Sequence, residues 1–209
     1  INNKIKLNLS SLKINNLPKI IAVSKTFKID KILPLIDYGH IDFGENKVQE
    51  AMDKWTEVKL KNSNIKLHMI GKLQTNKVKF AVKLFDFIHS VDSEKLAKKI
   101  ADEQLKINKK IKIFIQVNIG DEDQKSGINK NELNDFVLYC KKINLDVIGL
   151  MCIPPINLNS SDYFQDMKLL NNNFLFKELS MGMSSDYLEA SRNSATYLRI
   201  GSSIFGQRS

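Results

Sequence analysis

The chain has 209 residues, of which 43% are hydrophobic and 26% charged, and this composition is typical of a soluble globular protein with one core. No apolar run approaches the about 18 residues that suggest a membrane span, and no secretion signal is recognisable at its start. The net charge of +9 comes from lysines scattered along the whole chain, which predicts solvated lysines rather than a nucleic-acid or membrane interface.

Two cysteines are too few for a disulfide framework or a zinc site. Cys140 and Cys152 therefore favour a protein of the reducing cytoplasm. The histidines at positions 40, 68 and 89 show no metal-ligand spacing, so we expect no bound metal and interpret each histidine as structural.

Short β-rich runs alternate with helical segments along the chain. Apolar residues at i, i+3, i+4 and i+7 predict buried helix faces between the runs, as in the segment 48–55. Asp30 is expected to cap the first of these helices, and Asp92 or Ser93 a later one, whereas the Asn-rich stretch 171–173 is predicted to be a loop. The predicted strands cover residues 20–24, 41–43, 66–70, 87–91, 111–119, 147–151, 179–181 and 197–200, the fifth being the longest.

Eight β–α units in order imply parallel strands, because each helical crossover returns the chain to the same end of the sheet. The sequence therefore predicts one α/β domain over residues 1–209, a (β/α)8 TIM barrel that is compact for a fold of typically about 250 residues. A doubly wound open sheet is the main alternative fold.

In such a barrel the active site lies at the C-terminal ends of the strands. Lys25 directly follows the first buried run. A partly desolvated lysine loses its proton more easily than a surface lysine, and only the neutral amine attacks a carbonyl. A strand-end lysine that simply reaches water is the competing interpretation.

A phosphate site is the second candidate. Gly201 and Ser202 follow the last predicted strand, and barrels frequently bind phosphate with the loops after strands seven and eight. Ser180 and Ser184, after the seventh strand, add hydroxyl donors. A tight turn with ordinary capping serines would explain the same residues.

Several motifs in this order carry a resemblance to a known family. The sequence resembles the pyridoxal 5′-phosphate (PLP) homeostasis proteins, small PLP-binding proteins with the barrel of the alanine racemase N-terminal domain. The match runs from about Ile20 to Arg208. The matching motifs are Ile21-Ala22-Val23-Ser24-Lys25, Phe43-Gly44-Glu45-Asn46, His68-Met69-Ile70-Gly71, Lys125-Ser126-Gly127, Gly149-Leu150-Met151, Leu179-Ser180-Met181-Gly182-Met183-Ser184 and Arg199-Ile200-Gly201.

The resemblance implies a role for each of these positions. Lys25 would hold PLP as an internal aldimine, Asn46 would lie near the ring hydroxyl, and Met151 would pack by the pyridine ring. Arg199 would face the pyridine nitrogen. The phosphate would be held by Ser180 or Ser184 together with Gly201 and Ser202.

The resemblance also implies a function. We expect a PLP carrier in intracellular PLP homeostasis, without robust catalysis, that contacts apo-enzymes transiently and is a monomer. A PLP-dependent amino-acid racemase is the alternative, although the eight units leave no second domain to supply another acid–base group. A phosphorylated-sugar aldolase using Lys25 is a third possibility, with Glu45 as the one obvious carboxylate beside the lysine.

Overall fold

The computed structural model describes residues 1–10, 17–122, 126–155 and 158–207. Its eight parallel strands form one closed barrel in the order β1 to β8, and β1 pairs with β8 to close it. The barrel prediction is therefore confirmed, and the alternative of a doubly wound open sheet is wrong. The strands are β1 (Lys19–Val23), β2 (Asp42–Glu45), β3 (Lys66–Met69), β4 (Phe87–Val91), β5 (Lys112–Gln116), β6 (Asp146–Met151), β7 (Glu178–Ser180) and β8 (Tyr197–Ile200).

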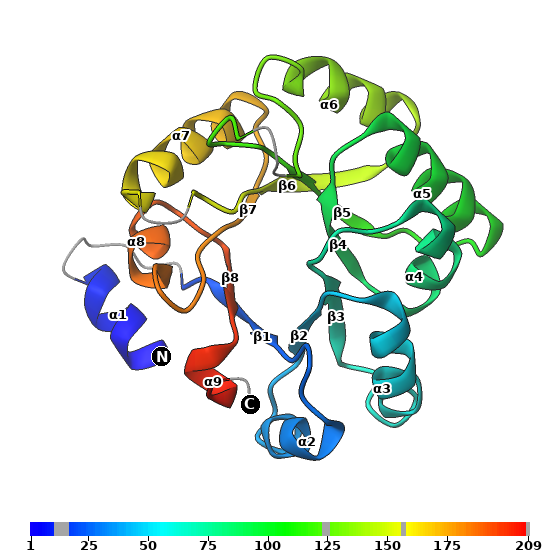
Figure 1. Ribbon diagram of the computed structural model, residues 1–209, viewed down its shortest axis with the longest axis vertical. Helices are drawn as coiled ribbons and strands as arrows, with labels where there is room; N and C mark the ends of the chain where they lie inside the picture. The colour runs from blue at the N-terminus through cyan, green and yellow to red at the C-terminus, as the bar shows by residue number, and fades with distance from the viewer. Residues whose placement is uncertain (11–16, 123–125, 156–157, 208–209) are drawn as a thin grey trace.

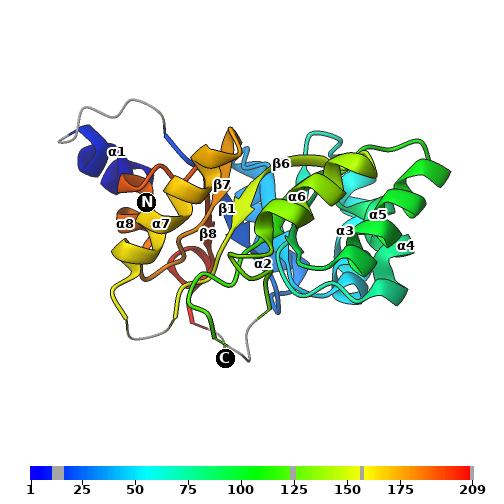
Figure 2. The same ribbon diagram turned by 90° about the horizontal axis from the view of Figure 1, so that it is seen from above.

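The helices surround the strands (Figure 1), and the view from above shows the same layer around them, with α1 at one edge of the molecule (Figure 2). Helix α1 packs on α8 through Asn8, whose side-chain amide donates to the Leu188 carbonyl oxygen at 2.9 Å. The helices are α1 (Asn2–Ser10), α2 (Ile29–Asp37), α3 (Val48–Lys61), α4 (Val78–Leu84), α5 (Glu94–Lys106), α6 (Leu133–Lys142), α7 (Ser160–Asn173), α8 (Tyr187–Arg192) and α9 (Ser202–Phe205), with a short 3-10 turn at Thr75–Lys77.

The main core lies between the barrel and its helices. The faces predicted from the 3.6-residue period are buried there, and Ala51 and Trp55 of α3 are fully buried against the sheet. A second cluster fills the barrel interior and consists of Ile21, Phe87, Phe114, Met151 and Tyr197. The interior is thus a packed layer of side chains, as expected for a barrel of eight strands.

Some local predictions are wrong. Ser93 caps α5, accepting from the Leu96 N–H, but Asp30 lies inside α2, whose N-cap is Lys28. The predicted loop at 171–173 is the last turn of α7. There Asn171 is buried because its amide bonds the backbone of Leu150 and Phe176, so tertiary contacts outweigh its low helix propensity. The longest strand is β6 and not the fifth, because β5 ends at Gln116.

Candidate functional site

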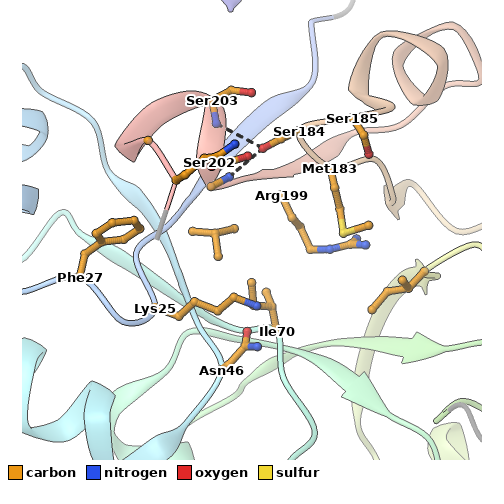
Figure 3. Close-up of a pocket in the computed structure, with 15 residues that line it drawn as sticks. Lys25, Phe27, Asn46, Ile70, Met183, Ser184, Ser185, Arg199, Ser202 and Ser203 are labelled. Carbon is orange, nitrogen blue, oxygen red and sulfur yellow. Dashed lines mark hydrogen bonds between the residues drawn. The ribbon is translucent and has the colours of Figure 1, made fainter. Parts of the chain in front are cut away.

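A cavity of about 710 Å³ opens at the C-terminal end of the barrel, within the size range of small-molecule sites. Its walls come from the ends of β1 and β8 and from the loops after β2, β3, β6 and β7. Of the predicted site residues, six line it: Lys25, Asn46, Ser184, Arg199, Gly201 and Ser202. Figure 3 shows Lys25 extending toward Asn46 and Ile70, with Ser184, Ser202 and Ser203 gathered on another wall.

Two predicted residues do not belong to the described lining. Met151 is fully buried in the interior cluster of the barrel, and Ile153, two residues further along, contributes to the wall. Ser180 is also fully buried, and its hydroxyl oxygen accepts a hydrogen bond from Arg199 Nη1 at 2.8 Å. Both side chains point into the barrel interior, which the position of a residue near a strand end does not reveal.

The backbone around Lys25 is held by three contacts. Thr26 has a φ of 69°, which β-branched residues seldom adopt, and its N–H donates to Glu50 Oε1 at 2.6 Å. Lys54 Nζ donates to the Ser24 carbonyl oxygen at 2.9 Å and to Glu50 Oε1 at 3.0 Å. Burial alone would raise the pKa of Glu50, but these hydrogen bonds lower it. Hydrogen bonds to Ser24 and Thr26, the residues before and after Lys25, therefore fix the turn that carries the lysine.

Glu45 belongs to the support of this turn and not to the described cavity wall. Its Oε1 accepts from Ser24 Oγ at 2.7 Å, Lys54 Nζ at 2.9 Å and Trp55 Nε1 at 2.9 Å. The carboxylate is fully buried between β2 and α3. Glu45, the carboxylate expected beside Lys25, therefore lies on the neighbouring strand and outside the described lining of the cavity.

Asn46 is positioned by a close backbone contact. A β-carbon on Gly71 would lie 2.5 Å from the Asn46 carbonyl oxygen, so this position accepts only glycine without a shift of the backbone. The loops after β2 and β3 therefore touch directly beneath the Asn46 side chain.

The opposite wall is rich in hydroxyl and amide groups. Ser184 Oγ accepts from the N–H groups of Gly201 at 3.3 Å and Ser203 at 3.4 Å. A β-carbon on Gly201 would meet no atom closer than 3.5 Å, and its φ is −114°, so the fold itself does not require glycine there. The missing side chain leaves the wall open to a ligand that approaches the backbone closely.

Arg199 closes the deep end of the cavity, beside Met183 in Figure 3. Its guanidinium is buried and donates to Ser180 Oγ and to the Cys152 carbonyl oxygen, both at 2.8 Å. Burial lowers the pKa of Arg199 and raises that of the neighbouring Cys152 thiol to about 12. Cys152 is thus a protonated, buried thiol.

Other lining residues were not predicted as site residues. Val23, Ile70 and Met183 lie inside motifs that the resemblance already contained, and Ser203 neighbours the predicted Ser202. Phe27, Ile153 and Gln207 carry no local sequence signal. The unpredicted lining residues are Val23, Phe27, Ile70, Ile153, Met183, Ser185, Ser203, Gly206 and Gln207. Lys125 and Arg208, which the resemblance included, lie outside the described residues.

In the described ranges, no helix has both the length and the apolar character needed to cross a bilayer. No group of three or more His, Cys, Asp or Glu side chains within those ranges could hold a metal ion.

Comparison with known proteins finds similar sequences along almost the whole chain. Residues 3–209 match the family model of the alanine racemase N-terminal domain. The pyridoxal phosphate homeostasis protein of Aquifex aeolicus is 36% identical over 203 residues, which cover 92% of this chain and 88% of that protein. The chain belongs to the pyridoxal phosphate homeostasis protein family. The relative from Pasteurella multocida is 35% identical over 201 residues, 91% of this chain and 86% of its own.

A solved structure of this family agrees with the fold. PipY of Synechococcus elongatus, in a structure with PLP bound, superposes with a TM-score of 0.84 at 32% identity. The match covers 97% of this chain and 100% of that chain. The family resemblance inferred from the motifs is thereby confirmed over almost the whole chain.

Proposed function

We propose that this protein binds PLP in the cavity at the C-terminal end of the barrel, through a Schiff base to Lys25, and carries it without robust catalysis of its own. One observation supports this proposal most: among the described lining residues, the ionisable side chains are one amine, Lys25, and one guanidinium, Arg199. That set can bind a phosphorylated aldehyde, since the amine meets the aldehyde and the cationic, hydroxyl-rich walls suit an anion.

The covalent step uses the neutral amine of Lys25. It would attack the aldehyde carbon, a carbon–nitrogen double bond would replace the carbon–oxygen double bond, and the oxygen would leave as water with the two hydrogens of the amine. Bound PLP supplies an aldehyde and an electron-withdrawing ring. The serine wall, with Ser184, Gly201 and Ser202, would hold the phosphate, and Asn46 would lie on the ring hydroxyl side.

Arg199 would donate a hydrogen bond to the pyridine nitrogen. An arginine stays protonated and can only donate, so the nitrogen must accept and remain unprotonated. An unprotonated ring is a poorer electron sink than one paired with a carboxylate. This property suits a carrier better than an enzyme that must stabilise a carbanion.

The enzyme alternatives lack a second proton-transfer group in the described cavity wall. A racemase needs acid–base groups on both faces of its substrate, and Arg199 does not give up its proton. An aldolase would need a carboxylate near Lys25, but Glu45 is already bound by Ser24, Lys54 and Trp55.

The setting of this carrier is part of the same proposal. It would act in the cytoplasm and exchange PLP with apo-enzymes through transient contacts. A monomer would suffice, because all eight strands of the closed barrel come from one chain.

The test is to add PLP, record the visible spectrum, reduce with borohydride and map the labelled peptide. We expect a Schiff-base band and a label on Lys25 in the native protein and in Lys28→Ala, a control at an exposed lysine. Lys25→Ala should show neither. A label on another lysine would refute the assignment of Lys25, and the lack of any band would refute PLP binding.

Catalysis is tested separately in deuterated water. Incubation of the PLP-loaded protein with L-amino acids should give no α-proton exchange above that of free PLP. Exchange that is fast and lost in Lys25→Ala would identify an enzyme.

A further inference from the structure

A chain of four hydrogen bonds crosses the interior of the barrel from the cavity toward its opposite end. Arg199 Nη1 lies 2.8 Å from Ser180 Oγ, which lies 2.9 Å from His89 Nδ1. His89 Nε2 lies 3.0 Å from His68 Nδ1, and His68 Nε2 lies 2.9 Å from Asp42 Oδ1. These five residues, here called the relay, come from β8, β7, β4, β3 and β2.

The two ends of the relay fix the direction of every hydrogen bond in it. The guanidinium of Arg199 has only donors, and the carboxylate of Asp42 has only acceptors. His68 therefore donates from Nε2 and accepts at Nδ1. His89 must then donate from Nε2 and accept at Nδ1, where the hydroxyl of Ser180 donates. Ser180 Oγ is left to accept from Arg199, so each group has the hydrogens that this single direction needs.

Burial favours the neutral imidazoles that this direction requires. Both histidines are fully buried, His68 stacked on Phe87 and His89 on Phe114, each with 4.2 Å between ring centroids. Desolvation lowers the pKa of His68, although Asp42 opposes this, and lowers that of His89 further. Two neutral rings can each donate once and accept once.

The relay helps to compensate the buried positive charge of Arg199. A buried cation is costly unless it is compensated, yet among the described residues no carboxylate forms an ion pair with this guanidinium, and Asp186 acts on it only through its charge from further away. In the relay every acceptor end faces toward Arg199 and the last acceptor is a carboxylate. Hydrogen bonds arranged head to tail polarise one another.

We propose that Ser180, His89, His68 and Asp42 are positioning residues that hold the guanidinium of Arg199 in its place on the cavity wall. None of the four belongs to the described lining of the cavity, so they act on a ligand through Arg199 alone. The identity of that ligand as PLP rests on the proposed function. The direction of the relay does not rest on that function, because the hydrogen bonds belong to the protein without ligand.

The first test therefore uses the protein without PLP. Nitrogen-15 NMR of the histidine rings should show His68 and His89 as neutral tautomers with the hydrogen on Nε2. Ser180→Ala removes the donor to His89 Nδ1 and should alter the tautomer signals of His89. Ser191→Ala, a control at a buried serine of α8 outside the relay, should leave them unchanged. Hydrogens on Nδ1 in both rings of the native protein would overturn the proposal.

The second test measures PLP binding by absorbance titration. Ser180→Ala and His68→Phe, which keeps an aromatic ring against Phe87, should each weaken binding by about tenfold and shift the visible band of bound PLP. Ser191→Ala should bind like the native protein. If the native protein binds PLP and both relay variants bind equally well with the same band, the positioning role is refuted. If the native protein fails to bind PLP, the proposed function is refuted, and the NMR result still decides the relay.

Discussion

The barrel interior and the shell between barrel and helices bury charge in different ways. In the shell, Glu45 meets Lys54 directly at 2.9 Å. In the interior, Arg199 reaches the carboxylate of Asp42 only through three neutral side chains. Both partners of the direct pair also bond to Ser24, so the pair fixes the strand end that carries Lys25. The indirect arrangement occupies only two of the five guanidinium N–H groups in the described contacts, so it leaves donors for a ligand.

The largest expected effect breaks the direct pair. Lys54→Met leaves the buried carboxylate of Glu45 with only Ser24 and Trp55 as donors, so the free energy of unfolding should fall by about 3 kcal/mol or more. Urea denaturation measures this.

Two further variants calibrate the loss in Lys54→Met. Glu45→Gln in the same chain removes the uncompensated charge and should recover part of the stability. Lys98→Ala, in an exposed pair with Asp102, should change stability little. An equal loss in Lys54→Met and Lys98→Ala would show that the burial of the Glu45–Lys54 pair has no special effect.

The interior should respond to pH through the two histidines. Their pKa values in the folded protein lie below 6.5, so below that pH the unfolded chain binds more protons than the folded one. The free energy of unfolding should therefore fall as pH drops from 7 to 5, by at most about 1.4 kcal/mol per pH unit for each histidine.

Burial is the largest cause of both lowered pKa values, and the charged groups around the rings modify its effect. Asp42 and Asp86 favour protonation of His68, and Lys19 opposes it. His68 and Arg199 oppose protonation of His89. His68→Phe should reduce the slope measured by urea denaturation at several pH values. An unchanged slope in that variant would mean that His68 takes up protons as readily in the folded protein as in the unfolded chain.

Among the buried charges, the smallest expected effect on stability is at the cavity end of the relay. Arg199→Met removes the buried cation together with its need for compensation, so the free energy of unfolding should change by about 1 kcal/mol or less. PLP affinity should nevertheless fall, because the donors facing the cavity are lost. A loss of stability as large as that of Lys54→Met would show that interior and shell depend equally on their buried cations.

The sequence was most informative where a local pattern has a single structural outcome. The alternation of β-rich runs and helical periods predicted eight parallel units, and the strand ends predicted which side of the barrel carries the cavity. Asn171 shows the limit of local patterns. Its propensity favours a loop, but its amide is needed by the backbone of β6 and the loop before β7, so the helix extends over it.

Three members of the relay, His68, Ser180 and Arg199, lie in the matching motifs. Their connection had no sequence signal, because the five members come from five different strands and share no spacing. His68 and His89 were interpreted as structural histidines without partners that could be named. The resemblance implies that Met151 packs by the pyridine ring, and the position of Ser180 at the seventh strand predicts a hydroxyl donor to the phosphate. The direction of each side chain, inward below the cavity, depends on the tilt and stagger of the closed barrel.

The sequence by itself determined the family, the barrel and the candidate lysine, because these depend on periodicity and on motifs of neighbouring residues. Only the tertiary structure decided which strand-end residues face the cavity, what holds the Lys25 turn, and how the charge of Arg199 is compensated. Those features arise from contacts between residues far apart in the chain, and barrel closure alone brings such residues within hydrogen-bond distance.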